Sequence, residues 1–167
     1  MAQLAKSSVA WVLAMLMLRS VIGCNTRGRD SADAALAVVP DSAATLVVDV
    51  GGGDNNFVPL ENGSSVDVVS GPQGGFHIWT SVRVHDPSVS LVQINLSLRF
   101  EDTGAPAGRA SRVAASLDPP VEGARVHVHM TNFVDDPQAV RGRRVVMRAE
   151  VIADDERHGA GELVVVP

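Results

Sequence analysis

A strict alternation of apolar and polar residues over 92–100 is the feature of this sequence that most restricts its fold. Every second residue is apolar, while the residues between them are Gln, Asn, Ser and Arg. A period of two predicts a β-strand with one buried face and one solvated face, as antiparallel sheets have.

The rest of the chain supplies partners for this strand. Short runs rich in Val, Ile and Phe are separated by clusters of Gly, Pro, Asn and Asp. Together with 92–100 they predict eight strands, at 45–50, 66–69, 76–85, 92–100, 112–117, 125–133, 144–153 and 162–166. No run of twelve or more residues after position 24 has a helical period. This pattern predicts an all-β sandwich of seven or eight strands, with a jelly roll or an open barrel as alternatives.

The amino terminus has a different character. Residues 1–8 carry Lys6, residues 9–18 are apolar and uncharged, and Val21-Ile22-Gly23-Cys24 follows. Ten residues are too few to span a bilayer as a helix, which needs about 20. The segment resembles the signal peptide and lipobox of bacterial lipoproteins. Ordinary secretion with non-lipid cleavage and a buried amino-terminal helix are the alternatives.

This resemblance implies that residues 1–23 are removed and that Cys24 carries a diacylglycerol and a further acyl chain such as palmitate. Two or three chains hold a protein on a membrane almost permanently. Asn25 stands where an aspartate would favour the inner membrane, so we expect an outer-membrane lipoprotein of the cell envelope. Residues 24–44 are small and polar, which predicts a flexible tether, and 45–167 form the β-sandwich domain.

The last third of the chain carries a second resemblance. Gly142 precedes a long strand, an acidic turn follows at 154–159, and the final strand is rich in valine. This order resembles the end of bacterial immunoglobulin-like domains. It implies an immunoglobulin-like form of the sandwich.

Charge and cysteine content exclude some classes of function. Residues 1–23 contain two basic residues and no acidic one, so removing them changes 14 basic against 19 acidic to 12 against 19, a net charge of −7. An acidic chain argues against a nucleic-acid partner, because phosphate contacts need clustered basic residues. Cys24 is the only cysteine, so the domain has no internal disulfide.

Histidines suggest a metal site. His127 and His129 are two residues apart on a predicted strand and would share one face, where two imidazoles can bind copper or zinc. The arrangement resembles immunoglobulin-like copper carriers of the periplasm, and His77 is a third candidate ligand. Alternatively, His127 and His129 lie on a solvated face beside Arg125 and Thr131.

A glycine-rich turn at 71–75 leads into a second candidate site. His77 and Trp79 share one face of the strand that follows, and an exposed Trp beside a His can form a contact surface for a partner or ligand. We therefore expect Gln73, His77 and Trp79 to contact a partner. The alternative places Trp79 in the core.

The sequence supports catalysis less than it supports metal binding or a contact surface. The chain contains no Gly-x-Ser-x-Gly, His-Glu-x-x-His or phosphate-loop motif. The acidic turns at 135–136 and 154–156 lack an Asp-x-Asp-x-Asp-Gly calcium loop. We expect a non-enzymatic lipoprotein that presents an immunoglobulin-like binding or structural module to an envelope protein or small ligand, without a cofactor. The alternative function is periplasmic copper or zinc binding through His127 and His129.

Overall fold

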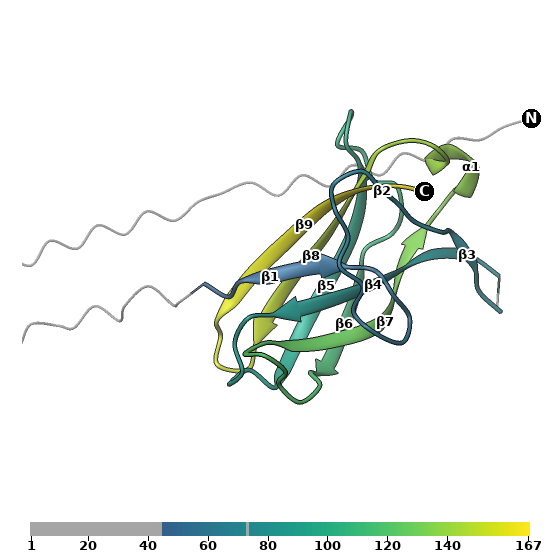
Figure 1. Ribbon diagram of the computed structural model, residues 1–167. Coiled ribbons are helices and arrows are strands. Elements are labelled where there is room, and N and C mark those ends of the chain that lie inside the picture. The colour runs from purple at the N-terminus through teal and green to yellow at the C-terminus, as the bar shows by residue number, and fades with distance from the viewer. Residues whose placement is uncertain (1–44, 73) are drawn as a thin grey trace, which may run out of the picture. The chain divides into compact units, whose positions relative to one another are not determined.

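The computed structural model describes residues 45–72 and 74–167, which form a sandwich of two packed sheets (Figure 1). The predicted anchor at Cys24, the segments 1–23 and 24–44, and Gln73 lie outside the described residues. The elements, in chain order, are β1 (Val48–Gly51), β2 (Ser64–Ser65), β3 (Val69–Ser70), β4 (Phe76–Val84), β5 (Leu91–Phe100), β6 (Ser111–Ser116), β7 (Arg125–Val134), α1 (Pro137–Val140), β8 (Val145–Ala153) and β9 (His158–Val166).

The four-stranded sheet is built around β4. Strand β7 pairs with β4 along its whole length on one edge, while β1 and β3 pair with opposite ends of β4 on the other edge. All three pairings are antiparallel.

The five-stranded sheet has the order β2-β9-β8-β5-β6. Its pairings are antiparallel except that the two-residue strand β2 runs parallel to β9. The alternating segment at 92–100 became β5, the strand between β8 and β6, as its one-sided apolar pattern predicts.

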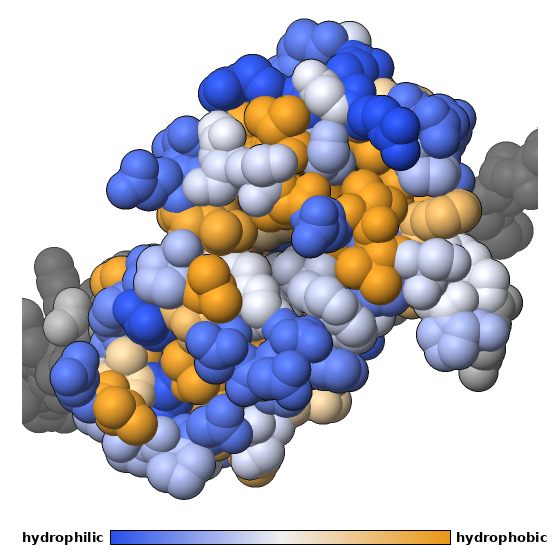
Figure 2. Space-filling model, turned by 45° about the vertical axis from the view of Figure 1, so that its right-hand side comes forward, coloured by the Kyte–Doolittle hydropathy of each residue, from blue (hydrophilic) through white to orange (hydrophobic). Residues whose placement is uncertain are grey.

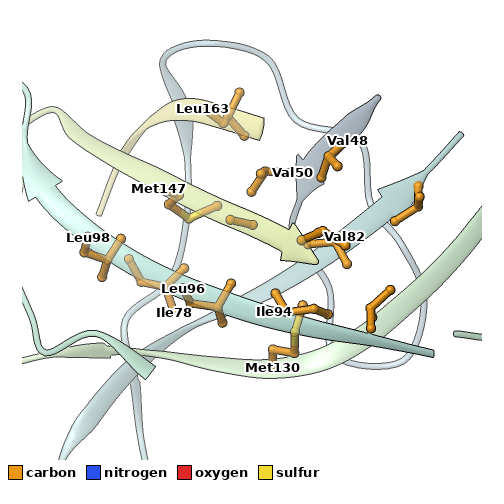
Figure 3. Close-up of a cluster of buried hydrophobic side chains, with 14 of the residues drawn as sticks. Val48, Val50, Ile78, Val82, Ile94, Leu96, Leu98, Met130, Met147 and Leu163 are labelled. Carbon is orange, nitrogen blue, oxygen red and sulfur yellow. The ribbon is translucent and has the colours of Figure 1, made fainter. Parts of the chain in front are cut away.

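The core lies between the sheets, where apolar side chains of both inner faces meet (Figure 3). Most of these residues are less than one-tenth exposed, and fully burying one side chain of this size is worth about 1.5–3 kcal/mol. The side chains labelled in Figure 3 are Val48, Val50, Ile78, Val82, Ile94, Leu96, Leu98, Met130, Met147 and Leu163.

The predicted β-sandwich is confirmed. Strands β1, β3, β4 and β7 form one sheet and β2, β5, β6, β8 and β9 the other. The structure adds two elements that the pattern did not predict, the short strand β2 and the one-turn helix α1. Among the described residues, no helix has the length and hydropathy needed to cross a membrane.

Candidate functional site

Strand β4 separates the core from the candidate site. Ile78, Val82 and Val84 point inward and are at most 1% exposed, whereas His77, Trp79 and Arg83 alternate with them on the outer face. The two faces of this strand therefore follow the predicted period of two.

Three rings meet on this outer face, and we name them the His–Trp–His cluster: His77, Trp79 and His129. The His77 ring lies edge-on to the Trp79 ring, with centroids 4.4 Å apart and planes at 75°. The His129 ring lies 4.3 Å from the Trp79 ring at 34°. Trp79 is half-buried, so it is neither the fully buried core residue of the alternative interpretation nor a freely exposed side chain.

A β-bulge in β7 brings His129 to the cluster. Thr80 pairs with Met130 and Val82 pairs with His127, so two residues of β7 stand opposite Ser81 alone. His129 takes up the extra residue with a left-handed φ of 62°, which is uncommon for a residue other than glycine. Bulges of this kind redirect a side chain, and here the redirected side chain is an imidazole.

The bulge lies between the two histidines of the predicted pair. Cross-strand partners point to the same side of an antiparallel sheet, and the partner of His127 is the buried Val82. His127 therefore points to the inner side of the sheet, while His129 contacts Trp79 on the outer side. The regular alternation that would have put both imidazoles on one face is interrupted between them.

The loop 52–60 is anchored over the bulge by two successive carbonyl groups. The Ser81 hydroxyl donates a hydrogen bond of 3.0 Å to the carbonyl oxygen of Gly53. His129 Nδ1 donates to the carbonyl oxygen of Asp54, also at 3.0 Å. Because a carbonyl oxygen only accepts, Nδ1 of His129 carries the proton of this hydrogen bond, and its Nε2 is not used in it.

A cleft of about 400 Å³ opens beside Trp79. Strand β1 pairs with β4 only from Ser81 onward and β3 pairs only with Phe76 and His77, so no described strand pairs with residues 78–80 on this edge. The cleft lies at this break, between loop 52–60, the segment 65–67 and the β4 residues Ile78 and Trp79.

His77 is the buried polar member of the cluster. It is 6% exposed, and its Nε2 atom is buried without a hydrogen-bond partner. Burial lowers the pKa of His77, and the nearby His129 lowers it further. His77 is therefore a neutral imidazole at pH 7, and an unpaired buried polar atom is costly unless something binds to it.

Metal-binding residues are sparse in the part of the chain that the structure describes. No three His, Cys, Asp or Glu side chains there lie close enough to hold one ion. Two residues of the acidic turns have structural roles instead: Asp136 accepts hydrogen bonds from the first amides of α1, and Asp155 binds Arg157.

The outer face of the five-stranded sheet carries a row of ion pairs. Arg99 binds both carboxylate oxygens of Glu162, at 3.0 Å each. Arg148 binds Glu162 and Glu150, both at 2.7 Å. Every charge in this row has a partner within the chain.

Comparison with known proteins does not indicate what this site does. No protein-family model matches the chain, and no curated protein and no solved structure is significantly similar to it. The function must therefore be argued from the residues themselves.

Proposed function

We propose that this chain is a membrane-anchored lipoprotein of the bacterial envelope whose β-sandwich is a non-enzymatic binding module. The support for the anchor is the apolar run 9–18 followed by Val21-Ile22-Gly23-Cys24. The lipid on Cys24 holds the protein on the membrane, with the outer membrane as the expected location.

The observation that supports the binding surface is the half-buried Trp79 beside an open cleft. Tryptophan combines a large apolar ring with one hydrogen-bond donor, and it dominates many binding surfaces. Surface hydrophobicity alone would not choose this place, since the exposed large apolar residues lie in several places, with Val58 at this cleft and Leu91 and Ile152 together on the other sheet. The full set is Val47, Val58, Phe76, Leu91, Val121 and Ile152. On the face drawn in Figure 2, apolar side chains form small groups separated by polar ones.

The anchor and the domain act together through the segment between them. Residues 24–44 number 21, and a fully extended chain of that length spans at most about 70 Å. Confinement within this distance raises the local concentration of the domain near its envelope partner. The contact itself is made by the outer face of the four-stranded sheet.

The anchor is tested by intact mass and detergent-phase partitioning of the expressed chain beside a Cys24→Ala variant. The proposal predicts that the unmodified chain loses residues 1–23, gains acyl mass and enters the detergent phase, while Cys24→Ala does neither. A chain that keeps Met1 and stays in the aqueous phase would overturn the anchor.

The contact surface is tested with two apolar substitutions on different sheets. Trp79→Ala removes the side chain that is proposed to contact the partner. Leu91→Ala shortens a side chain of the five-stranded sheet that is 52% exposed. A partner recovered from the envelope fraction should bind Trp79→Ala at least about 30-fold more weakly, since tryptophan hot spots contribute 2 kcal/mol or more. Leu91→Ala should bind like the unmodified chain. Equal binding of all three proteins would place the contact elsewhere.

A second candidate function is copper or zinc binding by His77 and His129, in place of the pair His127 and His129. Its support is that the pKa of His77 is lowered and its Nε2 is unpartnered, and that both imidazoles pack against the same Trp79 ring. Titration of the untagged protein with Cu²⁺ and Zn²⁺ tests this function. Binding should be lost in His77→Ala and His129→Ala and retained in His127→Ala, and retention in all three would exclude it.

A further inference from the structure

We infer that the cleft beside Trp79 binds an organic cation, a guanidinium or ammonium group carried on an apolar stem. This inference rests on the proposed function, because it names the class of ligand for the same surface. It is supported by the residues that line the cleft and by the arginine side chains that stack on the phenylalanine rings of this chain.

The lining of the cleft combines apolar side chains with carboxylates. Val58, Leu60 and Val66 supply most of the apolar part, since Ile78 is only 1% exposed, and Asp54 and Asp67 are both exposed. No basic side chain is among the described residues that line it. A ligand with a hydrocarbon stem and a positive head matches this arrangement, because the carboxylates attract the charge while the stem displaces water from the wall.

Most phenylalanine rings of this chain carry a stacked arginine, a contact that Trp79 does not have among the described residues. The guanidinium carbon of Arg83 lies 4.1 Å from the ring centroid of Phe57, that of Arg109 lies 4.3 Å from Phe133, and that of Arg143 lies 4.0 Å from Phe100. Three of the four phenylalanine rings thus hold an arginine of the same chain.

Trp79 has the ring type that binds cations best, yet no described arginine stacks on it. Its ring packs against the imidazoles of His77 and His129, and Trp79 is one of the residues that line a cleft with two carboxylates. The neighbouring Arg83 does not fill this position because it stacks on Phe57. A cation supplied from outside the chain completes the arrangement that the phenylalanine rings already have.

Two sources carry the same cation, a free small molecule and an arginine side chain of a protein partner. We compare butylguanidinium with acetyl-Gly-Arg-Gly-amide as probes. Their neutral controls are butylurea and the same peptide with citrulline, which keep the shape and remove the charge.

Trp79 reports directly on binding. Trp11 and Trp79 are the only tryptophans, so in a full chain that carries Trp11→Phe the emission comes from Trp79 alone, whether or not residues 1–23 are removed. We expect both guanidinium probes to change this emission and the neutral controls to bind at least about 5-fold more weakly. Tighter binding of the arginine peptide would identify a partner side chain as the source, and tighter binding of butylguanidinium a small molecule.

Three charge-neutralising variants locate the site. Asp54→Asn and Asp67→Asn should each weaken binding of the guanidinium probes about 2- to 5-fold, the range that exposed charge pairs show. Asp118→Asn removes an exposed carboxylate that does not line the cleft, and it should leave binding unchanged. Circular dichroism confirms that all three variants are folded.

The outcomes separate this inference from the proposed function. Equal binding of charged and neutral probes would overturn the cation inference and leave Trp79 as a binding surface for another class of ligand. An equal effect of Asp118→Asn, or no binding of either guanidinium probe, would also overturn it. Failure of the proposed function would appear instead as unchanged partner binding by Trp79→Ala.

Discussion

The side chains of both sheets alternate between an inner and an outer face, but the polar groups of the two outer faces differ in their partners. On the five-stranded sheet, Arg99, Glu162, Arg148 and Glu150 neutralise one another in a continuous row. On the four-stranded sheet, His77 keeps a buried atom without a partner and Trp79 borders an open cleft. Arg99 Nε of the five-stranded sheet is likewise buried without a hydrogen-bond partner. The difference between the faces is therefore that one pairs its charges within the chain, whereas the other places Trp79 at an open cleft.

The registers of the strand pairings differ in the same way, while left-handed residues other than glycine also occur in turns, at Glu122 and Glu156. The described pairings β5–β8 and β8–β9 run without a register shift, while the pairing β4–β7 contains the bulge. The left-handed His129 and the loop over it are held by Ser81 and Asp54. Strained residues persist only where their surroundings hold them, and they gather at functional sites. The four-stranded sheet is therefore where substitutions test function, and the five-stranded sheet serves as the control.

The largest effect is expected from Gly53→Ala, which breaks the loop over the His–Trp–His cluster. Gly53 has a φ of 99°, and a Cβ atom there would lie 2.1 Å from the carbonyl oxygen of Asn56. We expect a loss of about 2–3 kcal/mol in urea denaturation and a red shift of Trp79 emission. The control is Gly123→Ala, where φ is 81° but the added atom meets open space, and it should cost about 1 kcal/mol. Equal losses of unfolding free energy in the two variants would show that the close approach of Gly53 to the carbonyl group of Asn56 does not matter for stability.

A smaller effect is expected from Asp86→Asn, in the segment between β4 and β5, where the carboxylate pairs with Arg157 of the β8–β9 turn. Hydrogen bonds from Ser88, and then from Arg157, lower the pKa of Asp86 from 3.8 to about 2. A lowered pKa means that this stabilisation is complete above pH 3.8 and is lost as the pH falls toward 2. Asp86→Asn should cost about 1–2 kcal/mol at pH 7 and remove this part of the acid dependence. Urea midpoints between pH 7 and 2 check it, and Trp79 emission of the folded protein should stay the same.

A third effect, on the pH dependence of stability, is expected from His77→Phe at mildly acidic pH and tests the burial of His77. Its pKa is lowered from 6.5 in the folded protein, so below pH 6.5 the unfolded chain takes up the proton first and stability falls. His77→Phe should flatten the dependence of the unfolding free energy on pH between 7 and 5. His158→Gln, at an exposed histidine of β9, should keep it. An identical slope in the two variants would mean that His77 does not cause the dependence.

The smallest effect is expected from Glu162→Gln in the ion-pair row. Glu162 and both of its arginine partners are about 40% exposed, so the loss should be at most about 1 kcal/mol and should shrink as salt is added. Probe binding at the Trp79 cleft should not change. A large loss, or an altered Trp79 response, would show that the two faces are coupled.

Much of the fold could be predicted because it depends on local pattern. The alternation at 92–100 predicts β5 with its buried face, and the alternation of β4 predicts that Ile78 and Trp79 point to opposite sides. The strand β2 and the helix α1 escaped prediction, since two and four residues are too few to show a period. The turn 51–56 was recognisable from its glycines and asparagines, but its place over Trp79 was not.

For β5 and for residues 77–84 of β4, the sequence alone determined which residues face the core and which face outward, because side chains on a regular strand alternate with a fixed period. Only the tertiary structure decided that His129 rather than His127 joins His77 and Trp79. That choice depends on a register shift between β4 and β7, strands separated by some forty residues of chain. It also decided that a cleft opens at residues 78–80, since β1 and β3 each pair with only one end of β4. Pairing between distant strands is set by the packing of the whole sandwich, and a local pattern contains no information about it.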